Sequence, residues 1–78
     1  MFSIGAFAII FDENGNVLLS HRRDIDAWNL PGGGVETREL PNEAVIREVK
    51  EETGLDVVIL RLVGVYGKVD KDEIIFAF

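Results

Sequence analysis

Three glutamates in the middle of the chain, Glu48, Glu51 and Glu52, are spaced by three and four residues. On a helix this spacing places the carboxylates on one face, where like charges repel by about 0.2 to 0.5 kcal/mol per pair. Oxygen ligands gathered in this way suit a hard divalent cation such as Mg²⁺ or Mn²⁺, which would offset the repulsion. A solvated acidic face, partly neutralised by Arg47 and Lys50, is the alternative. These residues alone leave both interpretations open.

The sequence around the glutamates forms a longer pattern. Gly33 is followed after five residues by Glu39, and after seven more by residues 47–55, which read REVKEETGL. This string resembles the signature of the Nudix hydrolases, Gx5Ex7REUxEExGU, where U is aliphatic. At average residue usage, chance agreement of the seven invariant positions at a given start is on the order of 10⁻⁹. The flanking residues 28–33, WNLPGG, also look like the approach to this motif in small family members, so the similarity covers most of the chain.

The resemblance implies a fold and an activity. The fold would be α/β, a mixed sheet that carries a loop, helix and loop. The activity would be hydrolysis of a nucleoside diphosphate linked to another moiety, with Mg²⁺ required and Mn²⁺ an alternative. In this chemistry water attacks phosphorus, the cations neutralise the diphosphate and a carboxylate accepts a proton. The implied partner is a small-molecule nucleotide derivative.

The resemblance also assigns roles residue by residue. Glu39 would support the metal cluster, and Arg47 would orient a neighbouring glutamate through a charge-assisted hydrogen bond. Together with the glutamates of the helix these form the implied catalytic set. The implied metal ligands are the main-chain carbonyl of Gly32 and the carboxylates of Glu48, Glu51 and Glu52.

Two positions depart from the family pattern. Arg38 stands where relatives commonly have glycine, and Leu40 stands where a Ser or Thr often caps the helix. Leu40 lacks a side-chain acceptor, which costs roughly 1 kcal/mol and predicts a frayed helix start. Relatives also continue with more sheet, a second helix and often a later carboxylate. The acids after the motif are expected to be loop or strand-edge charges rather than that carboxylate: Asp56, Asp70, Asp72 and Glu73.

Further residues are candidates for substrate contact. Arg22 and Arg23 could meet phosphate or ribose, with solvation in an exposed loop an equal alternative. Trp28 could stack on a nucleobase, although packing in the core is favoured for it. His21 has no second histidine or cysteine nearby and is expected to be structural or exposed. The glycines at 32–34 lack the Gly-Lys-Ser or Gly-Lys-Thr of a P-loop and are expected to place a carbonyl on a metal.

The elements that must position these groups begin with a predicted hairpin. Residues 2–11 and 16–21 have strand composition, and Asn14 and Gly15 tolerate the positive φ of a tight turn between them. These two strands are therefore expected to be antiparallel neighbours. A loop, a short extended piece and an irregular glycine segment are predicted at residues 22–26, 28–30 and 31–34.

A helix is predicted over residues 41–53. Pro41 suits the first turn and Gly54 suits the left-handed position just past the end. At 100° per residue the face predicted to pack on the sheet comprises Val45, Ile46, Val49 and Thr53. Strands are then predicted at 57–66 and 74–78, with a turn at 67–73. The aromatic side chains expected in the core are Phe2, Phe7 and Phe11.

The amino-acid composition excludes several classes of protein to which this chain could belong. A chain of 78 residues, 47% apolar and 28% charged, forms one small globular domain, whole or partial, over residues 1–78. A net charge of −6 argues against nucleic acid as a partner. The absence of cysteine excludes disulfides and thiolate metal sites and makes the cytoplasm the expected location. The longest apolar run, residues 4–11, is too short to span a membrane and follows no secretion signal, so no membrane association is expected.

The chain ends within its last predicted strand, where Phe76 and Phe78 keep the apolar alternation. We therefore expect a partial domain, or an open sheet edge that a second copy covers as a homodimer. Three interpretations follow: a Nudix-type hydrolase, a catalytically incomplete module that binds nucleotide and metal, and one half of a paired assembly.

Overall fold

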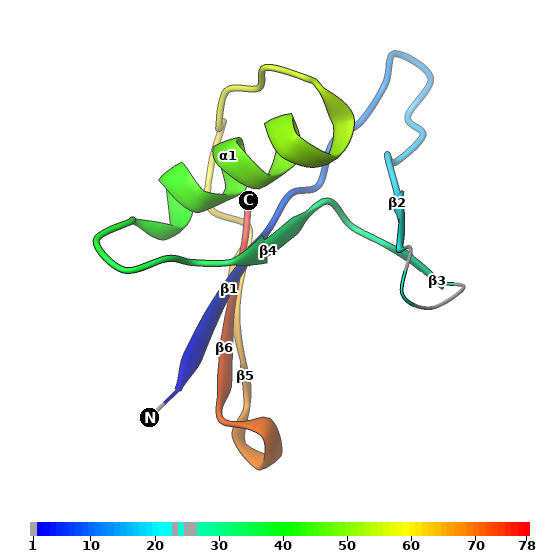
Figure 1. Ribbon diagram of the computed structural model, residues 1–78. Helices are drawn as coiled ribbons and strands as arrows, with labels where there is room; N and C mark the ends of the chain where they lie inside the picture. Colours follow the sequence, from blue (N-terminus) through cyan, green and yellow to red (C-terminus); the bar gives the residue numbers. More distant parts are fainter. Residues whose placement is uncertain (1, 23, 25–26) are drawn as a thin grey trace.

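Figure 1 shows a computed structural model of the protein, which describes residues 2–22, 24 and 27–78. Within these residues lie one α-helix, a four-stranded sheet and a two-stranded sheet. The α/β fold expected from the sequence is confirmed. In chain order the elements are β1 (Ser3–Phe7), β2 (Ser20–Arg22), β3 (Ala27–Asn29), β4 (Gly32–Gly34), α1 (Pro41–Thr53), β5 (Gly64–Lys68), the 3₁₀ turn η1 (Val69–Lys71) and β6 (Glu73–Ala77).

The main sheet is mixed and has the strand order β4-β1-β6-β5. β1 runs antiparallel to β4 and parallel to β6, and β5 and β6 form an antiparallel pair joined by η1. α1 packs on the sheet near β1 and β4 (Figure 1). The core between them consists of small side chains, which let the helix lie close to the strands: Ala6, Ala8, Ala44, Val45 and Val49.

The hairpin predicted at the start of the chain forms only in part. Its turn is present: Gly15 has φ +82°, and the N–H of Leu18 donates to the carbonyl of Ile10 at 2.9 Å. Regular strand pairing ends sooner than predicted, because β1 stops at Phe7 and only the isolated bridge between Phe11 and Val17 follows. β2 pairs instead with β3, which lies beside it on one side of the main sheet (Figure 1).

The glycine segment was predicted to be irregular, and this prediction is wrong. Gly32, Gly33 and Gly34 form edge strand β4, paired with β1 from Phe7 to Gly5. Glycine is unfavourable in strands, but here it allows close approach of the backbone. Gly32 has φ +153°, and a Cβ there would lie 2.7 Å from the Cα of Phe7.

The helix bounds predicted from the sequence are confirmed. Leu40 supplies no side-chain cap, but its own N–H donates to Glu43 Oε1 at 2.9 Å, and its carbonyl accepts from Ala44 N–H at 2.9 Å. The first turn is therefore hydrogen-bonded rather than frayed. Gly54, with φ +78°, ends the helix by donating to the carbonyl of Lys50.

The face of the helix that meets the sheet differs from the predicted one at two positions, Ala44 and Ile46. Ala44, Val45 and Val49 are buried, whereas Ile46 is 39% exposed. Thr53 is half-buried, and its hydroxyl donates to the carbonyl of Val49 at 2.7 Å. Ala44 belongs to the buried cluster that contains Ala6 and Ala8, where its small side chain lets the helix lie close to the sheet.

The strand predicted at 57–66 is also too long, since β5 begins at Gly64. The apolar alternation is present: Val57 and Ile59 pack against the core, while Val58 and Leu60 are exposed. Within residues 57–63 the N–H of Val63 donates to the carbonyl of Ala77 at 2.7 Å, but the segment forms no regular strand, and alternation alone does not make one. The turn is correspondingly shorter than predicted, because residues 67, 68 and 73 belong to β5 and β6.

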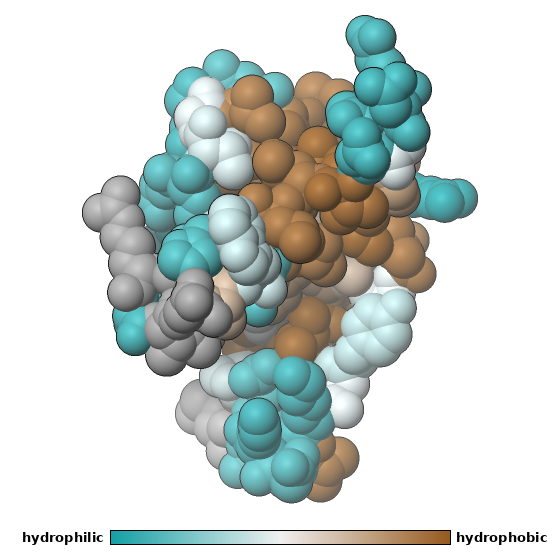
Figure 2. Space-filling view, turned by 90° about the vertical axis from the view of Figure 1, so that its right-hand side faces the viewer, coloured by the Kyte–Doolittle hydropathy of each residue, from teal (hydrophilic) through white to brown (hydrophobic). Residues whose placement is uncertain are grey.

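Several large apolar side chains are exposed. Phe2 and Phe11, predicted to be in the core, are 44% and 63% exposed, and Phe7 is half-buried. Trp28, also favoured for the core, is 63% exposed. Apolar side chains gather on one face of the molecule in Figure 2. Within the described residues, no helix combines the length and apolar character needed to cross a membrane.

The close approach of β4 to β1 gives a stability test. Gly32→Ala should lower the free energy of unfolding by about 2 to 4 kcal/mol, because a Cβ would meet the Ala6 carbonyl and Phe7. Gly34→Ala is the matched control, since a Cβ there has nothing within 4 Å, and it should change stability by less than about 0.5 kcal/mol. Urea unfolding curves measure both, and equal shifts would contradict the packing argument.

Candidate active site

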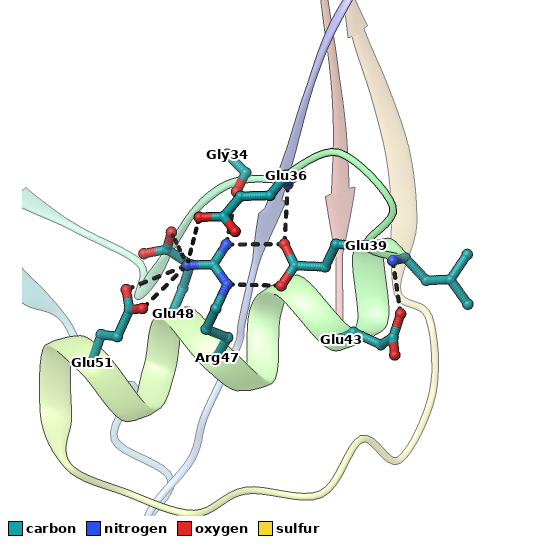
Figure 3. Close-up of polar contacts among 8 residues, drawn as sticks. Gly34, Glu36, Glu39, Glu43, Arg47, Glu48 and Glu51 are labelled. Atoms are coloured by element: carbon teal, nitrogen blue, oxygen red, sulfur yellow. Dashed lines mark hydrogen bonds and ion pairs between the residues drawn. The ribbon is translucent and has the colours of Figure 1, made fainter.

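Arg47 of α1 is the centre of a polar network at the junction of the helix with β4 (Figure 3). Its Nε and Nη2 donate to the two carboxylate oxygens of Glu39 at 2.7 and 3.0 Å. Nη2 also donates to the carbonyl of Gly34 at 3.2 Å. Nη1 donates to Glu48 at 3.0 Å and to both oxygens of Glu51 at 3.3 Å. One guanidinium thus joins the loop, the edge strand and two helical carboxylates.

Glu39 anchors this arginine. Its side chain is only 15% exposed, and its Oε1 accepts a second hydrogen bond from the backbone N–H of Glu36 at 3.0 Å. The hydrogen bonds from Arg47, with a smaller contribution from Glu36 N–H, lower the pKa of Glu39 to about 2. The same contacts, mainly that to Glu39, raise the pKa of Arg47. Both groups therefore stay charged at neutral pH.

The residue before Glu39 adopts an unusual backbone conformation. Arg38 has φ +66°, in the left-handed region that glycine enters at little cost. A residue with a Cβ pays roughly 1 to 2 kcal/mol there. The departure from the motif at this position is therefore tolerated with strain, and the turn still delivers Glu39 to Arg47.

Glu48 lies directly over Gly33. A Cβ on Gly33 would stand 2.7 Å from the carboxyl carbon of Glu48, so a larger residue here would displace this carboxylate. Burial raises the pKa of Glu48, and the hydrogen bond and charge of Arg47 act against that rise. The first glycine and the first helical glutamate of the motif are thus coupled by contact.

Glu52 is held by a different set of groups. Its Oε2 accepts from the backbone N–H of Gly32 at 3.0 Å, and its Oε1 accepts from Ser20 Oγ at 3.2 Å. It borders an open cleft of about 260 Å³ beside β4. The other residues that line this cleft are Phe7, Ser20, Asn29, Leu30, Gly32 and Gly33.

The register of β4 sets the direction of its carbonyls. Ala8 N–H donates to the Pro31 carbonyl and Val35 N–H donates to the Ile4 carbonyl, both at 2.8 Å, which marks the hydrogen-bonded pairs. Gly32 occupies an intervening pair, whose N–H and C=O point away from β1. Its N–H meets Glu52, so its carbonyl faces the same side as Glu52.

The three helical carboxylates and the Gly32 carbonyl offer the oxygen atoms that a hard cation prefers, although the carboxylates do not point toward one common position. In the part of the chain that the structure describes, no three acidic or histidine side chains stand close enough to enclose a metal ion. Glu48 and Glu51 turn toward Arg47, and Glu52 turns toward Gly32 and Ser20. Three carboxylates on adjacent helical turns and a backbone carbonyl on the same side are nevertheless oxygen ligands of the kind that Mg²⁺ and Mn²⁺ prefer.

Comparison with known proteins decides the family. The model of the NUDIX domain matches residues 1–78, the whole chain. The chain belongs to the Nudix family. A Bacillus subtilis (strain 168) protein, provisionally named an 8-oxo-dGTP diphosphatase, is 42% identical over 66 residues, which are 85% of this chain and 44% of that protein.

Solved Nudix structures have the same arrangement of elements. The MutT protein from Methanosarcina mazei Go1 superposes with a TM-score of 0.86 at 34% identity, covering 99% of this chain and 61% of that one. An ADP-ribose pyrophosphatase from Streptococcus suis 89-1591 superposes with a TM-score of 0.87 at 32% identity, covering 99% and 57%. The chain thus spans about half the length of the relatives that it matches.

The residues proposed for substrate contact lie around β2 and β3. Trp28 pairs with His21 across the hairpin, with ring centroids 4.7 Å apart. Side chains alternate along a strand, so this pair is on the opposite face of the hairpin from Ser20 and Asn29, which line the cleft. The backbone of Arg22 ends β2, whereas its side chain and all of Arg23 lie outside the described residues.

Sequence reasoning missed most of the residues that line the cleft of this Nudix domain. Phe7 and Ser20 belong to no motif, and Asn29 and Leu30 lie in the flanking residues 28–33 without a role assigned to them from the sequence. The available signal was alternation, which sets Ser20 and Asn29 apart from His21 and Trp28. Of the later acids, Asp56 accepts from Lys50 Nζ at 3.2 Å, as a surface charge would.

The ion pair of Glu39 and Arg47 predicts a pH dependence of stability. The pKa of Glu39 in the folded state, about 2, lies below its ordinary value of 4.5, so the pair stabilises the fold fully above pH 4.5 and loses its effect as the pH falls toward 2. Glu39→Gln should therefore be less stable than wild type at pH 7, and the difference should shrink below pH 4.5.

Urea unfolding at a series of pH values measures this difference. Glu13→Gln, on the exposed turn before Asn14, is the control for removal of one negative charge. A deficit of Glu39→Gln that stayed constant down to pH 3 would show that the pair does not stabilise the fold in this way.

Proposed function

We propose that this domain hydrolyses nucleoside diphosphates linked to another moiety, with Mg²⁺ or Mn²⁺ as the metal. The observation that carries the proposal is the layout of the Nudix motif in three dimensions. Glu48 and Glu52 reach from α1 to the glycine strand, with Arg47 fixing the junction and an open cleft beside them. Relatives that share this fold include a named pyrophosphatase.

The residues that would hold the metal are Glu48, Glu51, Glu52 and the carbonyl of Gly32. When bound, the cation supplies positive charge for the diphosphate and lowers the pKa of water. With a net charge of −6, a cation would offset the repulsion between the domain and an anionic substrate. Arg47 would keep Glu48 and Glu51 on one side of the helix, and Glu39 would keep Arg47 in place.

The cleft would take the part of the substrate next to the diphosphate. Phe7 and Leu30 give it apolar walls, and Asn29 adds an amide that can both donate and accept hydrogen bonds. The ring of Trp28 is exposed but lies on the hairpin face opposite Ser20 and Asn29, so it would stack only on a nucleobase that extends beyond the cleft; Arg22 and Arg23 stay candidates for phosphate or ribose. The names of the relatives include an 8-oxo-dGTP diphosphatase and an ADP-ribose pyrophosphatase, which favours a nucleotide without selecting one.

A second candidate is a module that binds nucleotide and metal without turnover. It is favoured by the carboxylates, which do not converge in the described part of the chain. In this candidate a second copy can pair with the exposed apolar surface. Light scattering distinguishes a monomer of 8.7 kDa from a dimer of twice that mass.

The test of hydrolysis is a panel of nucleoside diphosphate derivatives assayed with and without Mg²⁺. Turnover should require the metal and should fall by roughly 100-fold or more in Glu52→Gln, because the amide cannot replace a carboxylate ligand or proton acceptor. Far-UV circular dichroism should show that the variant keeps its fold. Glu13→Gln, at an exposed position that does not line the cleft, should match wild type.

The outcomes separate the two candidates. Equal rates for wild type and Glu52→Gln would refute the assignment of the site. A folded sample that binds Mg²⁺ and turns over none of the panel would establish the binding module instead.

A further inference from the structure

Glu52 is positioned differently from the other two helical glutamates of the motif. Glu48 and Glu51 accept hydrogen bonds from the guanidinium of Arg47. Glu52 accepts from two neutral donors, the backbone N–H of Gly32 at 3.0 Å and the hydroxyl of Ser20 at 3.2 Å. Its carboxylate is therefore oriented from β2 and β4 rather than from its own helix.

Ser20 lies outside the Nudix motif and is separated from Glu52 by 32 residues. It begins β2, pairs with Asn29 across the hairpin and lines the cleft. Its side chain is half-buried between the hairpin and the last turn of α1. This hydroxyl is thus a direct link from the β2–β3 hairpin to a carboxylate of the motif.

We propose that Ser20 is a positioning residue for Glu52, and this inference rests on the proposed function for the role of Glu52. Each carboxylate oxygen has two lone pairs. Ser20 uses one on Oε1 and Gly32 uses one on Oε2, so the carboxylate is fixed in orientation while a lone pair on each oxygen remains for a cation. Neutral donors orient the group and leave its negative charge in place. Partners of this kind typically change metal affinity by 10- to 100-fold when removed.

A matched pair of variants separates the hydroxyl from the shape of the side chain. Ser20→Thr keeps the hydroxyl. Ser20→Val introduces a side chain of nearly the same shape as threonine but without the hydroxyl. Threonine and valine are both β-branched and suit a strand. Mn²⁺ affinity, measured by calorimetry on the full chain, should fall by about 10- to 100-fold in the Val variant and by less than about threefold in the Thr variant. Ser3→Ala, whose hydroxyl lies 3.5 Å from the Asp72 carbonyl at the far end of β1, should leave the affinity unchanged.

A second measurement needs neither metal nor activity. If Ser20 holds Glu52 against Gly32, amide hydrogen exchange at Gly32 should accelerate in Ser20→Val and stay near wild type in Ser20→Thr. A merely structural hydroxyl would change global stability without this local effect, so urea unfolding of both variants is measured alongside.

Equal exchange at Gly32 in the Thr and Val variants would overturn the positioning role, whatever the Mn²⁺ affinities. Equal Mn²⁺ binding by wild type and Glu52→Gln would instead refute the metal assignment in the proposed function. In that case, exchange at Gly32 that is faster in Ser20→Val but not in Ser20→Thr would still establish that Ser20 positions Glu52.

Discussion

The bidentate contact between Arg47 and Glu39 is the interaction on which the site depends. Glu39 fixes the plane of the guanidinium through bonds of 2.7 and 3.0 Å, and the remaining donors then reach Gly34, Glu48 and Glu51. The pair is partly exposed, so its strength derives from geometry and multiple charge-assisted bonds rather than from deep burial. It ties the loop before α1 to the helix and to β4.

Close packing of backbones is the second constraint. Gly32 lets β4 approach β1, and Gly33 leaves room for the side chain of Glu48. Ala6 and Ala44, both fully buried, let α1 lie against the same two strands. A motif glutamate can reach the edge strand only because small residues occupy each of these positions, so the chemistry of the helix is inseparable from the packing beneath it.

The three helical glutamates are restrained in two ways, and this division has a chemical meaning. A guanidinium offsets the repulsion between Glu48 and Glu51 within the protein itself. Glu52 keeps its charge beside a cleft, oriented by uncharged donors. In a domain of net charge −6, Glu52 is thus a carboxylate at the cleft whose partners within the described residues are uncharged, which is where the proposed cation would bind.

The sequence by itself determined the family, the helix bounds and the identity of the charged cluster, because these depend on local spacing and on Pro41 and Gly54 at the helix ends. Only the tertiary structure decided that the glycines form a strand, that residues 57–63 lack one and that Ala44 rather than Ile46 is buried. The bond from Ser20 to Glu52 is of the same kind, since it joins segments 32 residues apart. Local propensity carries no record of such contacts, which form only where distant segments pack together.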